Sequence, residues 1–132
     1  MAYSLHIEET ARVAMARFEA ALAPGQLEAL AADSRALASR YGLCDSIVDF
    51  SGLVRIEIDT SYLRTMANRQ PVMTGKRRVL VAPQPEMFGL GRLYGLQQAA
   101  TTGATEPEMV RTLDEAFAAL GLRSPNFVPV VF

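Results

Sequence analysis

The polar triplet Asp59-Thr60-Ser61 carries the side chains best suited to a chemical switch. It lies between an extended segment and the expected start of a helix, the edge of an α/β sheet where ligand contacts concentrate. A phosphate on Thr60 or Ser61 would add about two negative charges, which backbone amides at a helix start can hold. Capping of the helix is the commoner use of such residues. The triplet is therefore either a phosphoacceptor or ligand-binding edge, or a plain helix cap.

A glycine-rich segment, F-G-L-G-R-L-Y-G at residues 88–95, is the second candidate. Its G-x-G-x-x-x-G spacing differs from that of a phosphate loop, and Glu86 puts a negative charge where the phosphate would bind. Gly91, Gly95 and Ala99 instead recur every four residues and form a smooth stripe along one helix face. Three interior glycines cost a helix about 3 kcal/mol relative to alanine, so a closely packed partner must offset them. That partner is the chain's own sheet or a second copy of the helix.

The sequence contains few residues that could catalyse a reaction or bind a metal. The single histidine, His6, excludes two-histidine zinc motifs, and the single cysteine, Cys44, excludes multi-cysteine zinc sites and a disulfide framework within the chain. His6 lies in an alternating strand pattern, and Cys44 is expected to be a small buried residue. Asp45 and Asp49 are too few to hold a metal. We therefore expect no catalytic residue, no cofactor and no metal.

Two further segments have unusual composition. Lys76-Arg77-Arg78 precedes an apolar strand pattern and indicates a solvated turn. The carboxyl-terminal residues 123–132 are apolar, with Phe127, Val130 and Phe132 among them. A tail of this kind is expected to dock, either on its own domain or on a partner subunit, as a candidate interface.

Composition limits the partners and the compartment. With 13 Lys and Arg against 14 Asp and Glu, the chain has a net charge of −1, which favours neither nucleic acid nor an anionic membrane as partner. The 132 residues fit one domain, and with 50% hydrophobic but only 8% aromatic residues its core must be mainly aliphatic. No segment has the pattern of a signal peptide or a membrane span, and a lone thiol fits a reducing compartment. We expect a cytoplasmic protein.

Periodicity predicts the elements that must position these residues. Alternating residues at 3–8 and 12–18 indicate a hairpin, and three- and four-residue spacing from Pro24 indicates a helix that stops at Gly42. The rest of the pattern predicts extended segments at 46–50 and 54–58, and a short helix that any of residues 59–61 can cap. These are followed by a central strand at 78–82, a helix at 86–100, a strand at 108–112 and a closing helix that stops at residue 121. This order predicts an α/β domain with a mixed, mostly parallel sheet of about five strands, an opening β-hairpin and about four helices.

Three segments in this order resemble the STAS domains, the family of bacterial anti-sigma-factor antagonists. They read I-V-D-F-S-G-L at residues 47–53, R-V-L-V-A-P-Q-P-E-M-F-G-L-G-R-L-Y-G-L at 78–96, and M-V-R-T-L-D-E-A-F-A-A-L at 109–120. The resemblance implies a STAS-like domain over residues 1–122, with the tail 123–132 after it, and a protein partner of the anti-sigma or kinase type.

The resemblance also bears on the polar triplet. Regulatory members of the family carry an Asp-Ser-x-Gly turn at the start of the second helix, and its hydroxyl is phosphorylated. The equivalent segment here reads E-I-D-T-S-Y at residues 57–62, without the glycine. By resemblance, Thr60 or Ser61 would be the phosphoacceptor in a degenerate motif.

Two functions of different classes follow. The leading hypothesis is a non-enzymatic, STAS-like regulatory domain that works through protein contacts and forms a homodimer through its tail or its small-residue stripe. The alternative is a small-molecule or lipid-type ligand-binding protein with an apolar pocket near the starts of the second and third helices. Met66, Met73, Met87 and Phe88 are the residues expected to line that pocket.

Overall fold

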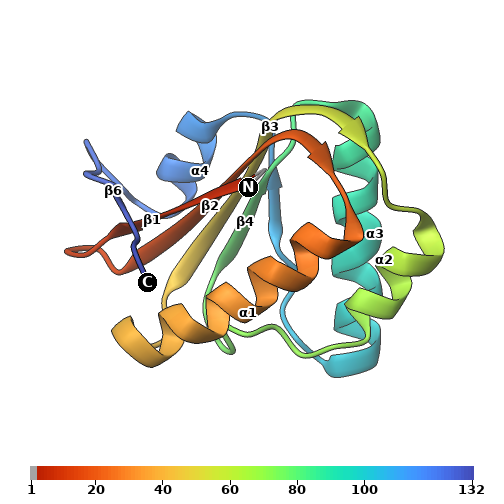
Figure 1. Cartoon of the computed structure of the whole chain (residues 1–132), viewed down its shortest axis with the longest axis horizontal. Coiled ribbons are helices and arrows are strands. Elements are labelled where there is room, and N and C mark those ends of the chain that lie inside the picture. Colours follow the sequence, from red (N-terminus) through yellow and green to blue (C-terminus); the bar gives the residue numbers. More distant parts are fainter. Residues whose placement is uncertain (1–2) are drawn as a thin grey trace.

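A computed structural model describes residues 3–132 of the chain (Figure 1). Its elements are β1 (Tyr3–Glu8), β2 (Val13–Leu22), α1 (Pro24–Tyr41), β3 (Asp45–Ile56), α2 (Thr60–Ala67), β4 (Arg78–Val81), α3 (Pro85–Thr102), β5 (Glu108–Val110), α4 (Leu113–Ala119) and β6 (Val128–Pro129). The first nine follow the predicted order, and β6 is additional.

The sheet has the strand order β5-β4-β3-β2-β1-β6. Strands β2 to β5 are parallel, whereas β1 is antiparallel to both β2 and β6. The predicted α/β class, with a mostly parallel sheet and an opening hairpin, is confirmed. A sixth strand arises because Val128 and Pro129 pair with Ile7 and His6. Proline is tolerated there because β6 is an edge strand, where a missing N–H breaks no continuing ladder.

Strand β3 is longer than the sequence pattern indicates. A break is expected at Ser51-Gly52, yet the strand continues past it, and its register with β2 shifts on either side of Glu19 and Ala20. A Cβ on Gly52 would lie 2.8 Å from the backbone oxygen of Phe18. Glycine at this position therefore lets β2 and β3 approach closely where their pairing is irregular, and it does not end the strand.

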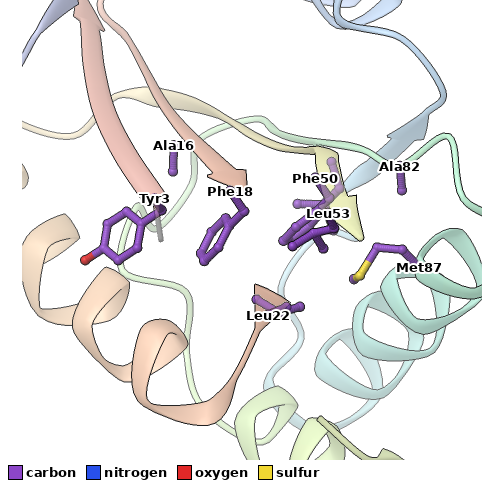
Figure 2. Close-up of a cluster of buried hydrophobic side chains, with 9 residues drawn as sticks. Tyr3, Ala16, Phe18, Leu22, Phe50, Leu53, Ala82 and Met87 are labelled. Atoms are coloured by element: carbon purple, nitrogen blue, oxygen red, sulfur yellow. The ribbon is translucent and has the colours of Figure 1, made fainter. Parts of the chain in front are cut away.

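Helices α1, α2 and α3 cover one face of the sheet, and α4 covers the other (Figure 1). On the α1–α3 face, the rings of Tyr3, Phe18 and Phe50 follow one another with centroid distances of 5.1 and 5.4 Å (Figure 2). On the α4 face, Phe127 from the tail stacks on Phe117 at 5.8 Å. The tail thus completes the smaller core, and the three-helix face forms the larger one.

Candidate functional site

A cavity of about 250 Å³ lies between the sheet and helices α1, α2 and α3. Its wall is mostly apolar and draws on all these elements, including Leu5, Ala16, Leu27, Leu30, Ala31, Val48, Phe50, Ile58, Leu63, Val72 and Leu80. Met66, Met73 and Met87 line it as well. Phe88 does not, because its ring lies under the guanidinium of Arg111 at 4.1 Å. Flexible methionine side chains suit a cavity that adapts to an apolar ligand.

The charged residues around this cavity are all of one sign. Arg35, Arg69 and Arg78 line it, and no aspartate or glutamate does. Arg69 is already paired, because its Nη1 lies 3.0 Å from the Glu28 carboxylate. Neither Arg35 nor Arg78 has a carboxylate within ion-pair distance among residues 3–132. The cavity wall therefore carries uncompensated positive charge.

Arg78 is held in place by neutral oxygens. Its Nη1 donates to the side-chain oxygen of Gln98 at 2.6 Å, and its Nη2 donates to the backbone oxygen of Thr105 at 2.6 Å. Gln98 is 1% exposed, and its Nε2 donates to the backbone oxygen of Arg69 at 2.8 Å and to Tyr94 Oη at 3.0 Å. Burial lowers the pKa of Arg78, which marks a site where its charge is poorly solvated.

The expectation of a solvated turn at Lys76-Arg77-Arg78 is wrong for Arg78. Lys76 and Arg77 are exposed, but Arg78 is the first residue of β4 and is partly buried. Its side chain lines the same cavity as that of Leu80, two residues later. The two-residue period of a strand is the signal that could have found it, because Arg78 and Leu80 must share a face.

The residues of the polar triplet at the start of α2 have different surroundings. Asp59 is the helix N-cap, and its carboxylate accepts from the backbone N–H of Tyr62 at 2.7 Å. Thr60 and Ser61 are exposed, and neither hydroxyl has a hydrogen-bond partner within residues 3–132. Tyr62 Oη lies 3.1 Å from the carboxylate of Glu28, which ties α2 to α1. One residue caps the helix, and the two hydroxyls face solvent.

The small-residue stripe of α3 lies against the chain itself. A Cβ on Gly91 would lie 2.6 Å from Met109 Cε, and one on Gly95 would lie 2.9 Å from Pro107 Cδ. Both glycines are buried, and Ala99 is partly buried. The close approach of β5 and the loop before it accounts for these glycines without a second copy of the helix.

The tail is attached to the domain at several points. The backbone N–H of Asn126 donates to the Glu8 carboxylate at 2.6 Å, and this hydrogen bond lowers the pKa of Glu8. Val130 N donates to the backbone oxygen of Leu5 at 3.0 Å. Arg40 Nη1 donates to the backbone oxygen of Val131 at 2.6 Å, but the apolar side chains at the end stay in solvent, with Val131 76% and Phe132 62% exposed.

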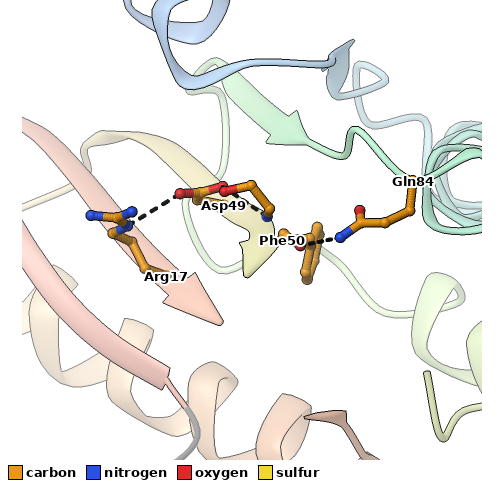
Figure 3. A network of polar contacts seen from close by, with 5 residues as sticks. Arg17, Asp49, Phe50 and Gln84 are labelled. Atoms are coloured by element: carbon orange, nitrogen blue, oxygen red, sulfur yellow. Dashed lines mark hydrogen bonds and ion pairs between the residues drawn. The ribbon is translucent and has the colours of Figure 1, made fainter. Parts of the chain in front are cut away.

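Of the other residues considered for catalysis or metal binding, His6, Cys44 and Asp49 are buried or partly buried within the domain. The buried Nδ1 of His6 has no hydrogen-bond partner among residues 3–132, and burial followed by the charge of Arg17 lowers the pKa of this histidine. Burial also raises the pKa of the Cys44 thiol, which is 1% exposed. Asp49 accepts from Arg17 Nε at 3.1 Å and from the Ser51 backbone N–H at 3.0 Å (Figure 3). Within residues 3–132, no three His, Cys, Asp or Glu side chains are grouped to hold a metal.

No family model and no curated protein matches this chain. A solved structure is similar to it over 89% of this chain and 96% of that one, with 18% sequence identity and a TM-score of 0.61. It is the structure of the anti-sigma factor antagonist SpoIIAA in its unphosphorylated form. The likeness confirms the predicted STAS-like fold. None of the helices in the described part of the chain is long and apolar enough to cross a membrane.

Proposed function

We propose that this chain is a non-enzymatic regulatory domain of STAS-like fold that binds a small apolar ligand beneath helices α1, α2 and α3. The observation that carries the proposal is the cavity of about 250 Å³ lined by Met66, Met73 and Met87. Protein interiors are closely packed, and an unfilled space lowers stability in proportion to its volume. A ligand that fills the space would recover that stability and shift the population toward the liganded state.

Helix α2 connects this cavity to the surface. Leu63 and Met66 on α2 line the cavity, while Thr60 and Ser61 at its start are exposed. A ligand that presses on the inner face of α2 can therefore change the surface that a protein partner meets. We propose no enzymatic role, since neither His6 nor Cys44 is among the residues that line the cavity and the Cys44 side chain is buried.

Binding of a neutral fluorescent probe tests the proposal. N-phenyl-1-naphthylamine should bind the purified protein in a saturable, one-to-one manner. Ala31→Met places a larger side chain in the cavity wall and should abolish this binding, whereas Ala32→Met, one residue along on the exposed side of α1, should keep it. Absence of saturable binding to the wild-type protein, or equal binding to both variants, would reject the cavity as a ligand site.

A second candidate function is a phosphorylation-controlled contact with a protein of the anti-sigma or kinase type. The exposed hydroxyls of Thr60 and Ser61 favour it, together with the fold shared with an antagonist that has an unphosphorylated form. A phosphate on Thr60 would lie at the positive end of α2 and one turn from Arg64, although the Asp59 carboxylate opposes it. Mass spectrometry of protein isolated from its native cells should find phosphate on one of these residues. Its persistent absence across growth conditions would count against the switch.

Homodimerisation through the tail is a further part of the proposal. The exposed side chains of Val131 and Phe132 favour it, because solvated apolar termini are unusual. Removal of these two residues leaves Phe127 and Val130 in place on the domain. Light scattering after size exclusion should report a dimer for the full chain and a monomer for the shortened one; a monomer in both would remove the dimer.

A further inference from the structure

We propose that the ligand of this cavity is a small monocarboxylic acid with an apolar body, and that Arg78 binds its carboxylate. This inference rests on the proposed function, because it assumes that the cavity takes a ligand. It adds the chemical class of the ligand and the residue that selects it.

The first argument is charge complementarity. Arg35, Arg69 and Arg78 line the cavity without any acidic side chain, although the whole chain has a net charge of −1. Glu28 neutralises Arg69 from outside the cavity wall. Arg35 and Arg69 are exposed, whereas Arg78 is partly buried and has no ion-pair partner among residues 3–132. A partly desolvated cation without a counter-ion is costly, and an anionic ligand at Arg78 would supply the missing charge.

The second argument is the hydrogen-bonding capacity of Arg78. A guanidinium has five N–H donors; Gln98 and the backbone of Thr105 accept from two of them, and the Tyr94 hydroxyl also interacts with the group. The N–H groups that remain can pair with a carboxylate. Tyr94 Oη accepts from Gln98 and donates to no other side chain or backbone group within residues 3–132, so its hydroxyl proton is also available to the ligand.

The third argument concerns Gln98, which fixes the direction of this donor group. Its side-chain oxygen accepts from Arg78, and its Nε2 uses both hydrogens, on Arg69 O and on Tyr94 Oη. At 1% exposure, the amide has no solvent to turn toward. Gln98 is therefore a positioning residue that prepares Arg78 and Tyr94 for the ligand rather than binding it.

Size and polarity define the rest of the ligand. A volume of about 250 Å³ is slightly below the roughly 300 Å³ at which ligand pockets commonly begin. The mostly aliphatic wall favours a saturated chain of about ten carbons over a polar or multiply charged molecule. We therefore use decanoate as the probe and decanol as its uncharged counterpart.

Isothermal titration of the full chain with decanoate and with decanol tests the inference. The wild-type protein should bind decanoate about tenfold or more tightly than decanol at neutral pH. Arg78→Gln should remove most of this preference, because it weakens decanoate binding far more than decanol binding. Tyr94→Phe, which deletes the hydroxyl that accepts from Gln98, should weaken decanoate binding several-fold and decanol binding less. Arg92→Gln, an exposed arginine of α3 outside the cavity, is the matched control and should bind as the wild type does.

The outcomes separate the two proposals. Equal affinity of the wild type for decanoate and decanol would overturn the carboxylate inference and leave the cavity as an apolar site. Binding of neither molecule would contradict both. If Arg78→Gln does not fold, the comparison of the wild type with Tyr94→Phe still tests the inference. A preference for decanoate that is the same in both proteins would show that Arg78 and Tyr94 do not form the carboxylate site.

Discussion

The guanidinium of Arg78 donates to the side-chain oxygen of Gln98 across 2.6 Å, which joins the first residue of β4 to a buried position of α3. The pair lies in the wall of the cavity between the sheet and the helices. Gln98 supplies the guanidinium with an acceptor but no negative charge. This relationship leaves Arg78 oriented and still without a counter-ion.

Replacement of Gln98 by alanine should strongly destabilise the protein. The substitution removes an amide that is 1% exposed, and it leaves Nη1 of Arg78 and the backbone oxygen of Arg69 without their hydrogen-bond partner, although Nη2 of Arg78 keeps Thr105. This should cost about 2–4 kcal/mol of unfolding free energy. Gln97→Ala is the matched control, because Gln97 makes one exposed hydrogen bond to Asn68, and it should cost less than about 0.5 kcal/mol. Urea denaturation measures both. Equal losses in the two variants would show that the Gln98 network is not important for stability.

Two glycines of the same helix should respond to alanine in opposite directions. A Cβ on Gly95 would lie 2.9 Å from the rigid ring of Pro107, so Gly95→Ala should lower the unfolding free energy by about 1 kcal/mol or more. A Cβ on Gly89 would meet no atom within 4 Å, so Gly89→Ala should raise it by about 0.5–1 kcal/mol through helix propensity. Thermal unfolding of both variants provides the comparison. Stabilisation by Gly95→Ala would contradict the close packing of α3 on Pro107.

The attachment of the tail through Glu8 should depend on pH. The hydrogen bond from Asn126, followed by those from the turn at Thr10 and Ala11, lowers the pKa of Glu8 below its ordinary value of 4.5. A depressed carboxyl pKa stabilises the fold above the ordinary value, and this contribution disappears as the pH falls through the lowered one. The stability difference between wild type and Glu8→Gln should therefore be constant at neutral pH and shrink below about pH 4.5. A difference that grows on acidification would contradict the assignment.

The thiol of Cys44 should be inert in the native protein. It is 1% exposed, and burial raises its pKa, so both access and thiolate content are low. A chromogenic disulfide reagent should react with it only as fast as the protein opens, and at once in concentrated guanidinium chloride. Rapid labelling of the native protein would instead indicate a reactive cysteine.

The fold could be predicted from the sequence because most of its signals are local. Pro24 and Gly42 delimit α1, and the alternation on either side of the first turn specifies the hairpin. The continuation of β3 through Gly52 could not be predicted in this way. A glycine is needed there because the backbone of Phe18, on another strand, lies too close for a side chain. The sixth strand was missed for a similar reason, because Pro129 disfavours a ladder unless its position is known to be an edge.

The candidate site was predictable only in its apolar part. Met66, Met73 and Met87 are residues that an apolar pocket would use, and all three line the cavity. Arg78 and Gln98 are 20 residues apart, and their contact depends on how β4 and α3 pack. The basic triplet by itself favours a solvated turn, and only the position of Arg78 in the strand, two residues before Leu80, indicates which face its side chain is on.

The methyl groups of the methionines provide the most direct test of ligand binding in the cavity. In protein labelled with carbon-13 at the methionine methyls, saturating decanoate should shift the signals of Met66, Met73 and Met87 and give contacts between ligand protons and these methyls. Met109, which packs beside Gly91 outside the cavity, should stay unchanged as an internal control. Unchanged signals from Met66, Met73 and Met87, or an equal shift of Met109, would contradict a ligand site beneath helices α1, α2 and α3.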